Sequence, residues 1–198
     1  HMDYSHQLFY KEKEVVNNLT RIGHIELPEI TPILGSKEQY FYRNKMEFSF
    51  SDSRWLTVEE IASTDDLGDR NALGFHIPGM WDKILDVKKC WLQGDPSNAI
   101  RNAVKDFALE HQIPFFNTRQ QTGVLRTLMI RNTSIGELMI VVQFFKEDTE
   151  SRIALLDHLK TSFPEITSLQ YIINGKANDT IYDQDVICYH GLDHIFEE

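Results

Sequence analysis

The sequence predicts an α+β domain in which a mixed or mainly antiparallel β-sheet is covered by helices. Two patterns support this prediction. Several short stretches alternate between apolar and polar residues with a period of two, as strands do, and pairs of such stretches are separated by single segments with helical spacing. The chain has 198 residues, of which 41% are hydrophobic and 25% charged, so it can bury a sizeable core.

Composition also limits the compartment and the partners. A net charge of -10 argues against a large nonspecific nucleic-acid surface, because binding to phosphates requires clustered Lys and Arg. Only two cysteines occur, Cys90 and Cys188, so we expect no disulfide framework and a cytoplasmic location. No apolar run approaches the ~20 residues of a membrane span, and we expect no membrane partner.

The N-terminal region differs from the rest of the chain. Residues 1–2 resemble the remnant of a purification tag. Apolar residues then recur at helical spacing over 4–22, Gly23 ends that helix, and two prolines mark an extended linker. We therefore expect a helix and linker over residues 3–35, followed by one compact α/β domain over residues 36–198.

The clearest strand pattern runs over residues 40–51. We expect one side of this strand to be buried, and it carries Tyr40, Tyr42, Asn44, Met46, Phe48 and Phe50. Its polar side carries Arg43 and Lys45, two cations close enough to meet a single anionic ligand. The alternative is an ordinary solvated sheet face.

The next segments predict a hairpin and a helix. Residues 52–70 are polar and rich in turn residues, including Thr64, Asp65 and Asp66, which predicts a surface insertion. Two short strands over 72–76 and 83–88 follow, joined by a turn. Asp95 is expected to cap a helix that ends before Pro114.

The second half of the chain predicts another hairpin, a helix and more strands. The hairpin comprises residues 123–131 and 137–145, and its second strand is apolar enough to be buried on both faces. A helix follows Asp148, with Ile153, Leu156, Leu159 and Phe163 facing inward. Residues 169–174 form a further strand, and the tail over 182–198 holds one or two more.

Few residue patterns point to chemistry within this chain. The ten glycines are spread singly, which argues against a phosphate-binding or dinucleotide loop. Cys188, His190 and His194 fit no established zinc spacing, so we expect Cys188 to be a buried small hydrophobic residue. Cys90 follows a strand and is expected to be a buried thiol beside Trp91.

Arg126 and Arg131 bracket the strand that begins the second hairpin. A five-residue separation places two side chains on opposite faces of a regular strand. A bulge or a strand end is therefore needed before both could serve one anion.

Five motifs, in one order, resemble a single family. They are YRNKMEFSF at 42–50, LGFH at 73–76, ILDVKKC at 84–90, GVLRTLMIR at 123–131 and GLDHI at 191–195. Together they resemble the central region of the S-adenosylmethionine-dependent RNA uracil-C5 methyltransferases, which make 5-methyluridine in ribosomal or transfer RNA.

The resemblance implies a fragment of a three-module enzyme. In that family an RNA-binding barrel precedes the central domain, and a methyltransferase domain with the cofactor loop, the nucleophilic cysteine and the glutamate base follows it. We therefore expect no catalytic residue here and no activity from this chain alone. We expect it to provide RNA contacts, with rRNA as the expected substrate ahead of tRNA, and to pack against the flanking domains of its parent, which uses S-adenosylmethionine.

The resemblance also implies roles for individual residues. Arg43 and Lys45 match the basic positions of the family's Y-R-x-[RK] strand, and Arg126 and Arg131 match those of its G-x-L-R segment, where contact with RNA or docking between domains is implied. Cys90 matches the fourth ligand of a 4Fe-4S cluster in the parent. The alternative from a different class is a non-catalytic scaffold domain whose acidic surface meets a basic partner.

Overall fold

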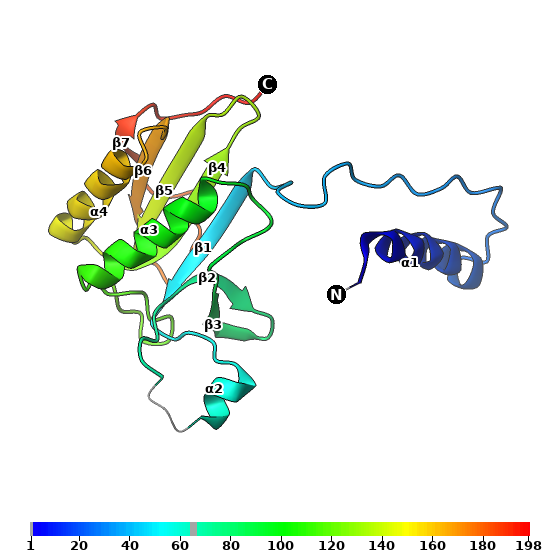
Figure 1. Cartoon of the computed structure of the whole chain (residues 1–198), viewed down its shortest axis with the longest axis horizontal. Helices are drawn as coiled ribbons and strands as arrows, with labels where there is room; N and C mark the ends of the chain where they lie inside the picture. Colours follow the sequence, from blue (N-terminus) through cyan, green and yellow to red (C-terminus); the bar gives the residue numbers. More distant parts are fainter. Residues whose placement is uncertain (1, 64–66) are drawn as a thin grey trace. The chain divides into compact units, whose positions relative to one another are not determined.

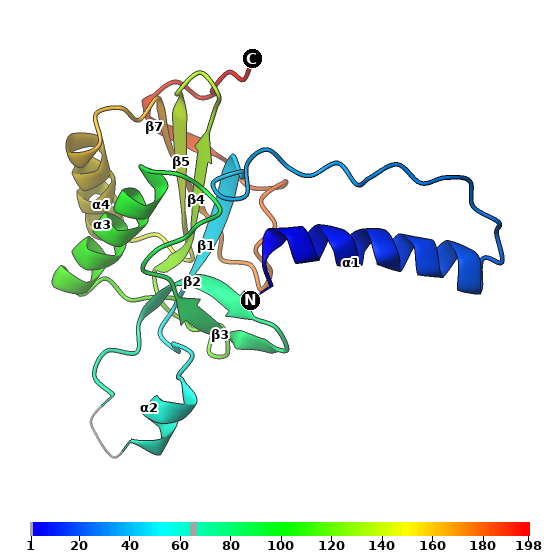
Figure 2. The ribbon, with the colours of Figure 1, turned by 45° about the vertical axis from the view of Figure 1, so that its right-hand side comes forward.

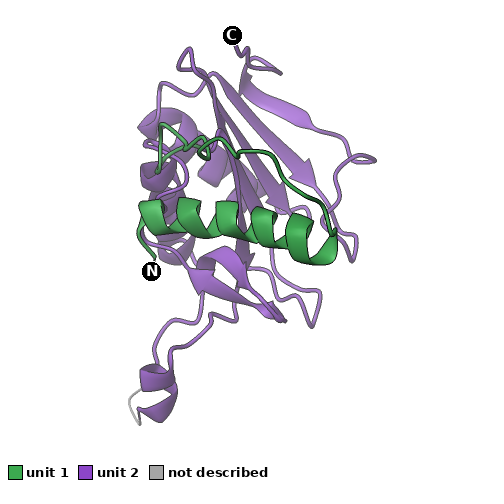
Figure 3. Cartoon of the chain, turned by 90° about the vertical axis from the view of Figure 1, so that its right-hand side faces the viewer, with its two compact units in different colours: residues 1–42 green, residues 43–198 purple. Residues whose placement is uncertain are grey.

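The structure is a computed structural model that describes residues 2–63 and 67–198. It divides the chain into two compact units, His1–Tyr42 and Arg43–Glu198 (Figure 3). The first unit extends to Tyr42, and the described residues 36–42 contain bends and no strand. The predicted tag residue His1 and the predicted turn residues Thr64, Asp65 and Asp66 lie outside the described residues.

The N-terminal unit is a helix followed by an extended segment. The helix α1 (Tyr4–Asn17) continues into a π-helical turn, η1 (Asn18–Ile22), and Gly23 is its C-cap, as the sequence predicts. The backbone N–H of Ile33 donates to Glu12 Oε2 over 3.0 Å, which ties the extended segment back to the helix. No residue of α1 or η1 is buried.

The second unit is built on a seven-stranded sheet with the strand order β3-β2-β1-β4-β5-β6-β7 (Figure 1). Neighbouring strands are antiparallel except for β5 and β6, which are parallel and are joined through α4. The predicted α+β class with a mainly antiparallel sheet is confirmed. The elements are β1 (Lys45–Ser51), α2 (Val58–Ala62), β2 (Ala72–Ile77), β3 (Met80–Asp86), α3 (Ser97–Glu110), β4 (Leu125–Asn132), β5 (Leu138–Phe144), α4 (Thr149–Ser162), β6 (Ser168–Ile173) and β7 (Ile187–Gly191).

One face of the sheet packs against α3 and α4 (Figure 2). Alternate residues of the strands, such as Phe48, Leu128 and Ile140, are fully buried there against Val104 of α3 and Leu159 of α4. The strand β5 lies between β4 and β6, and it is buried on both faces as predicted, because the chain between β6 and β7 crosses the side opposite the helices. This second side is called the open face below.

The strand β1 begins at Lys45, five residues later than the pattern predicts. Tyr40, Tyr42 and Asn44 are exposed, so their predicted burial is wrong. The physical reason is the length of the partner strand: β4 ends at Asn132, whose backbone N–H donates to the carbonyl of Asn44 over 3.0 Å. Before Asn44, the strands of the described residues offer no partner with which the chain pairs.

Two details of the helices also differ from expectation. Asp95 is not the N-cap of α3, because the helix begins one residue later and Pro96 occupies that position without a side-chain hydrogen bond. Ile153 of α4 is 42% exposed, whereas Leu155, Leu156 and Leu159 are buried. At about 100° per residue, Ile153 lies more than a quarter turn from the centre of that buried stripe.

The segment predicted as a surface insertion contains a short helix. α2 begins with a capping box in which the Thr57 side chain accepts from the Glu60 backbone and the Glu60 side chain accepts from the Thr57 backbone. This reciprocal pair satisfies two backbone N–H groups at the start of the helix. The helix predicted after Asp148 is α4, and the Asp148 side chain caps it by accepting from the backbone N–H of Ser151.

Candidate functional site

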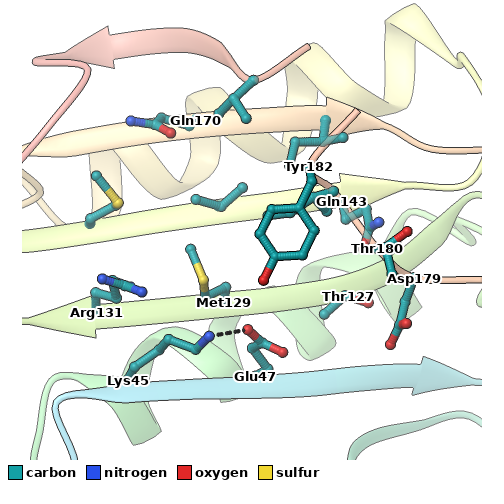
Figure 4. A pocket seen from close by; sticks show the side chains of 15 residues that line it. Lys45, Glu47, Thr127, Met129, Arg131, Gln143, Gln170, Asp179, Thr180 and Tyr182 are labelled. Carbon is teal, nitrogen blue, oxygen red and sulfur yellow. Dashed lines mark ion pairs between the residues drawn. The ribbon is translucent and has the colours of Figure 1, made fainter. Parts of the chain in front are cut away.

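The open face of the sheet carries a hollow of about 500 Å³ (Figure 4). Side chains from β1, β4, β5 and β6 form its floor, and the segment from Asp179 to Val186 forms a wall on one side. Floor positions alternate with core positions along each strand, because successive side chains of a strand point to opposite faces. The floor of the hollow therefore consists of the strand residues that alternate with the buried core residues.

Lys45 and Arg131 lie opposite each other on this face. The register of the antiparallel strands β1 and β4 pairs their Cα atoms, and both side chains line the hollow. Lys45 Nζ is 2.6 Å from Glu47 Oε1, while no carboxylate in the described part of the chain pairs with Arg131. Like charges directly opposite each other destabilise a sheet, so an anion bound between them would be stabilising.

Arg43 lies outside this arrangement. It precedes β1, its side chain is exposed, and it is not among the residues that line the hollow. Its backbone N–H donates to the carbonyl of Leu92 over 2.9 Å, which anchors the entry to β1. Arg43 is therefore outside the strand, and strand geometry does not place its side chain beside that of Lys45.

Arg126 sits at a β-bulge between Leu125 and Thr127. The bulge required for Arg126 and Arg131 to share a face is thus present. However, Arg126 is only 5% exposed and its Nη1 donates to the carbonyls of Asn174 and Lys176, over 2.8 and 2.7 Å. Burial lowers the pKa of Arg126, and the charge of Asp179 partly opposes that effect.

Aromatic rings complete the surroundings of Arg126. Its guanidinium lies 4.9 Å from the ring centre of Phe116 and 5.7 Å from that of Phe145. The side chain therefore joins the bulge to the segment that follows β6, and it does not line the hollow with Arg131. Of the four cations predicted to contact RNA, the structure brings Lys45 and Arg131 together.

The wall of the hollow is held by hydrogen bonds of its own. Asn174 Nδ2 donates to the carbonyl of Thr180 over 3.2 Å, and Lys176 Nζ donates to Thr180 Oγ1 over 3.1 Å. Lys176 also pairs with Asp183, and the resulting hydrogen bond lowers the pKa of that carboxyl. Tyr182 projects from this wall and is 99% exposed. Sequence reasoning missed this segment, which has no apolar periodicity.

Gln143 belongs to the floor of the hollow. It is 4% exposed, and its Nε2 is buried without a hydrogen-bond partner in the described part of the chain. Leaving a buried donor unsatisfied costs about 1–3 kcal/mol. Sequence reasoning did not single out Gln143, although a polar residue in an otherwise apolar strand was a usable signal.

Cys90 is buried in the loop after β3, as expected. Its backbone N–H donates to Asn98 Oδ1 over 2.7 Å, and its Sγ accepts from the backbone N–H of Leu92 over 3.5 Å. Among residues 2–63 and 67–198, no three His, Cys, Asp or Glu side chains are grouped so that they could hold a metal ion. Cys188 is exposed, contrary to the prediction, because it lies on the edge strand β7.

None of the helices in the two described ranges has the length and apolar character needed to cross a bilayer. No protein-family model matches the chain.

The chain is similar along its whole length to part of longer proteins. It is 56% identical over 200 residues to an uncharacterized RNA methyltransferase of Bacteroides thetaiotaomicron, covering 100% of this chain and 44% of that protein. It is 49% identical over 205 residues to an uncharacterized RNA methyltransferase of Porphyromonas gingivalis, with the same coverage of each. The chain therefore spans less than half the length of these curated relatives.

A solved structure shares the fold. The crystal structure of Pyrococcus abyssi tRNA (uracil-54, C5)-methyltransferase in complex with S-adenosyl-L-homocysteine matches with a TM-score of 0.66 and 23% sequence identity. The match covers 100% of this chain and 41% of that one. The mixed sheet with its helices on one face is thus a fold that also occurs as part of a tRNA methyltransferase.

Proposed function

We propose that this chain is the central domain of a longer parent protein. The parent is an RNA methyltransferase that transfers a methyl group from S-adenosylmethionine to C5 of a uridine in rRNA or tRNA. The observation that carries the proposal is the 56% identity, over the whole chain, to part of a protein named an RNA methyltransferase. The five motifs quoted above support the narrower uracil-C5 chemistry. The role of this chain is to contact RNA and to pack against the rest of its parent.

The open face supports a role in RNA contact. Arg131 has a planar guanidinium that bonds two phosphate oxygens at once. The exposed ion pair between Lys45 and Glu47 contributes about 0–1 kcal/mol, so a phosphate can replace the carboxylate at little cost. Arg43 extends the same basic region toward the start of β1 in this proposal, while Arg126 acts indirectly by holding the wall of the hollow.

The chemical step is assigned to the remainder of the parent. Methylation at C5 of uracil uses a thiolate that adds to C6 and a base that removes the C5 proton. Cys90 is buried with its Sγ accepting from Leu92, so it is not placed to attack a base. The glycines of this chain are spread singly, and we place binding of S-adenosylmethionine in the parent as well.

Cys90 is proposed as one ligand of a 4Fe-4S cluster in the parent only. The amide N–H of Leu92 that reaches its sulfur is the kind of contact that tunes cluster sulfurs. The described residues do not fit a cluster by themselves, because they group no further ligands with Cys90. The anaerobically purified parent should be brown and contain iron and sulfide, and Cys90→Ser should reduce both. A colourless wild-type parent would refute this assignment.

Methyl transfer by the full-length parent tests the proposed function. The parent, tritiated S-adenosylmethionine and either rRNA or tRNA are incubated together, and labelled nucleosides are identified after digestion. We expect 5-methyluridine from the full-length protein and none from the 198-residue chain alone. Absence of label in both RNAs, or label at another atom of the nucleoside, contradicts the proposal.

A further inference from the structure

We infer that the hollow on the open face binds one unstacked nucleotide of single-stranded RNA, with its base against Tyr182 and its phosphate between Lys45 and Arg131. The inference rests on the proposed RNA methyltransferase function and adds a particular site to it. Proteins commonly recognise RNA sequences through bases that are splayed out, stacked on an aromatic ring and bonded along their edges. The hollow provides a place for each of these parts.

The phosphate position follows from the two opposed cations. The strand register holds Lys45 and Arg131 face to face at one end of the floor. The sheet fixes their backbones on adjacent strands, so both side chains can reach a single group that lies above this part of the floor. Lys45 also has a replaceable partner in Glu47. A single phosphate placed between the two cations would remove their repulsion.

The base position follows from Tyr182. In Figure 4 its phenol projects from the wall over the sheet, toward the side where Lys45 and Glu47 pair. Its side chain is 99% exposed, so both its ring face and its hydroxyl remain available to a ligand. An exposed aromatic ring beside a cationic groove is the arrangement by which proteins stack bases of single-stranded nucleic acids.

The floor supplies groups that suit the edges and the face of a base. The amide nitrogen of Gln143 has no hydrogen-bond partner within residues 2–63 and 67–198. The terminal torsion of an amide side chain is broad, so the same group can offer a donor or an acceptor. Met129 and Met139 add adaptable apolar contacts. Asp179 is an acceptor for the N–H of a pyrimidine ring or amine.

The wall is held by hydrogen bonds within the chain itself. Arg126 bonds the carbonyls of Asn174 and Lys176, and Asn174 and Lys176 in turn bond Thr180, two residues before Tyr182. Arg126 is thus a positioning residue, which acts on RNA through Tyr182. A pre-ordered wall lowers the conformational entropy lost on binding.

Single-stranded RNA fits this site better than a duplex does. The faces of paired bases are stacked inside an A-form duplex and cannot reach a tyrosine ring. The chain has a net charge of -10, so its favourable contacts with phosphates are confined to local clusters such as this one. One nucleotide held at one hollow is consistent with such a limited basic area.

The experiment uses the 198-residue chain and a fluorescein-labelled oligouridylate of about ten nucleotides, a length within the range that single domains bind. Fluorescence anisotropy measures the affinity at several salt concentrations. We expect Tyr182→Ala to weaken binding by about 5- to 100-fold, and Tyr182→Phe to stay within about twofold of wild type. Arg131→Gln should weaken binding and reduce the salt slope by about 0.7.

Lys160→Gln is the matched control, because Lys160 is an exposed cation on α4, which covers the other face of the sheet. Its affinity and salt slope should equal those of the wild type. Tyr182 buries little surface, so Tyr182→Ala should also leave the melting temperature unchanged.

Three results would overturn the inference. They are unchanged binding in both Tyr182→Ala and Arg131→Gln, no binding of the oligouridylate at any salt concentration, and competition by S-adenosylmethionine but not by uridine 5′-monophosphate. Each of these outcomes rejects the nucleotide site while leaving the proposed function intact, because methyl transfer by the full-length parent is measured separately.

Discussion

Lys45 and Arg131 face each other across the neighbouring strands β1 and β4, and the only carboxylate that pairs with either, within the described residues, is Glu47. These two opposed cations lie on a floor beside an exposed tyrosine, and together they carry one more positive charge than Glu47 neutralises. This relationship connects the strand pattern of the sequence to the proposed contact with RNA.

Removing Glu47 should strengthen binding of the oligouridylate. In Glu47→Gln, Lys45 no longer has a carboxylate that competes with phosphate, so we expect the affinity to rise by about 2- to 5-fold. The free energy of unfolding should change by less than about 1 kcal/mol, since the ion pair is exposed. Anisotropy and thermal melting measure the two quantities. Weaker binding by this variant would mean that Glu47 itself contacts the ligand.

Replacing Arg126 should loosen the wall of the hollow. Arg126→Met keeps much of the side-chain volume but leaves the carbonyls of Asn174 and Lys176 without their donor. We expect a loss of about 2–4 kcal/mol in the free energy of unfolding and faster amide exchange over residues 174–183. Lys160→Met, at an exposed position, should change neither. Faster exchange confined to another part of the sheet would contradict the positioning role.

Replacing Gln143 should change the stability of the protein and its affinity for RNA in opposite directions. Gln143→Leu removes a buried donor for which the described residues hold no partner, so we expect the protein to become more stable by about 1 kcal/mol. The same change should weaken binding of the oligouridylate by about 2- to 10-fold, because the base loses a hydrogen bond. A purely structural role for Gln143 predicts that stability and binding change in the same direction.

Lowering the pH should protonate Asp183 and so weaken its interaction with Lys176, which stabilises the wall of the hollow. The pKa of Asp183 lies below the ordinary value of 3.8, chiefly because Lys176 donates a hydrogen bond to the carboxylate. A folded-state pKa below the unfolded value means that the pair stabilises the wall fully above pH 3.8 and loses that effect as the pH falls through the lowered pKa.

The protonation of Asp183 can be followed through the NMR signal of the backbone amide of Tyr182 as the pH is lowered from neutral. We expect the signal to shift with a midpoint below 3.8 in the wild type. In Asp183→Asn that transition should be absent at every pH. A wild-type midpoint above 3.8 would show that the interaction with Lys176 does not stabilise the charged carboxylate.

Much of the fold follows from local patterns. The period of two in β1, the apolar run of β5 and the helix that follows Asp148 depend on neighbouring residues only, and the structure confirms them. The start of β1 could not be predicted in this way, because it is set by where the partner strand ends at Asn132. The exposure of Tyr40 follows from that distant limit rather than from its own alternation.

The candidate site was predictable only in part. Lys45 and Arg131 carry the right chemistry, but their pairing depends on the register of strands far apart in the sequence. The bulge at Arg126 and the wall that carries Tyr182 arise from hydrogen bonds between side chains and backbone carbonyls, which leave no periodic signal. Sequence alone therefore pointed to the cations but not to the hollow they share.

The most direct test of the open face is the rate of RNA methylation by the full-length parent carrying Tyr182→Ala, compared with Lys160→Gln. We predict that kcat/KM for the RNA falls at least about 5-fold in Tyr182→Ala, mainly through a higher KM, and is unchanged in Lys160→Gln. Equal kcat/KM values for wild type and Tyr182→Ala would contradict the claim that this face holds the RNA.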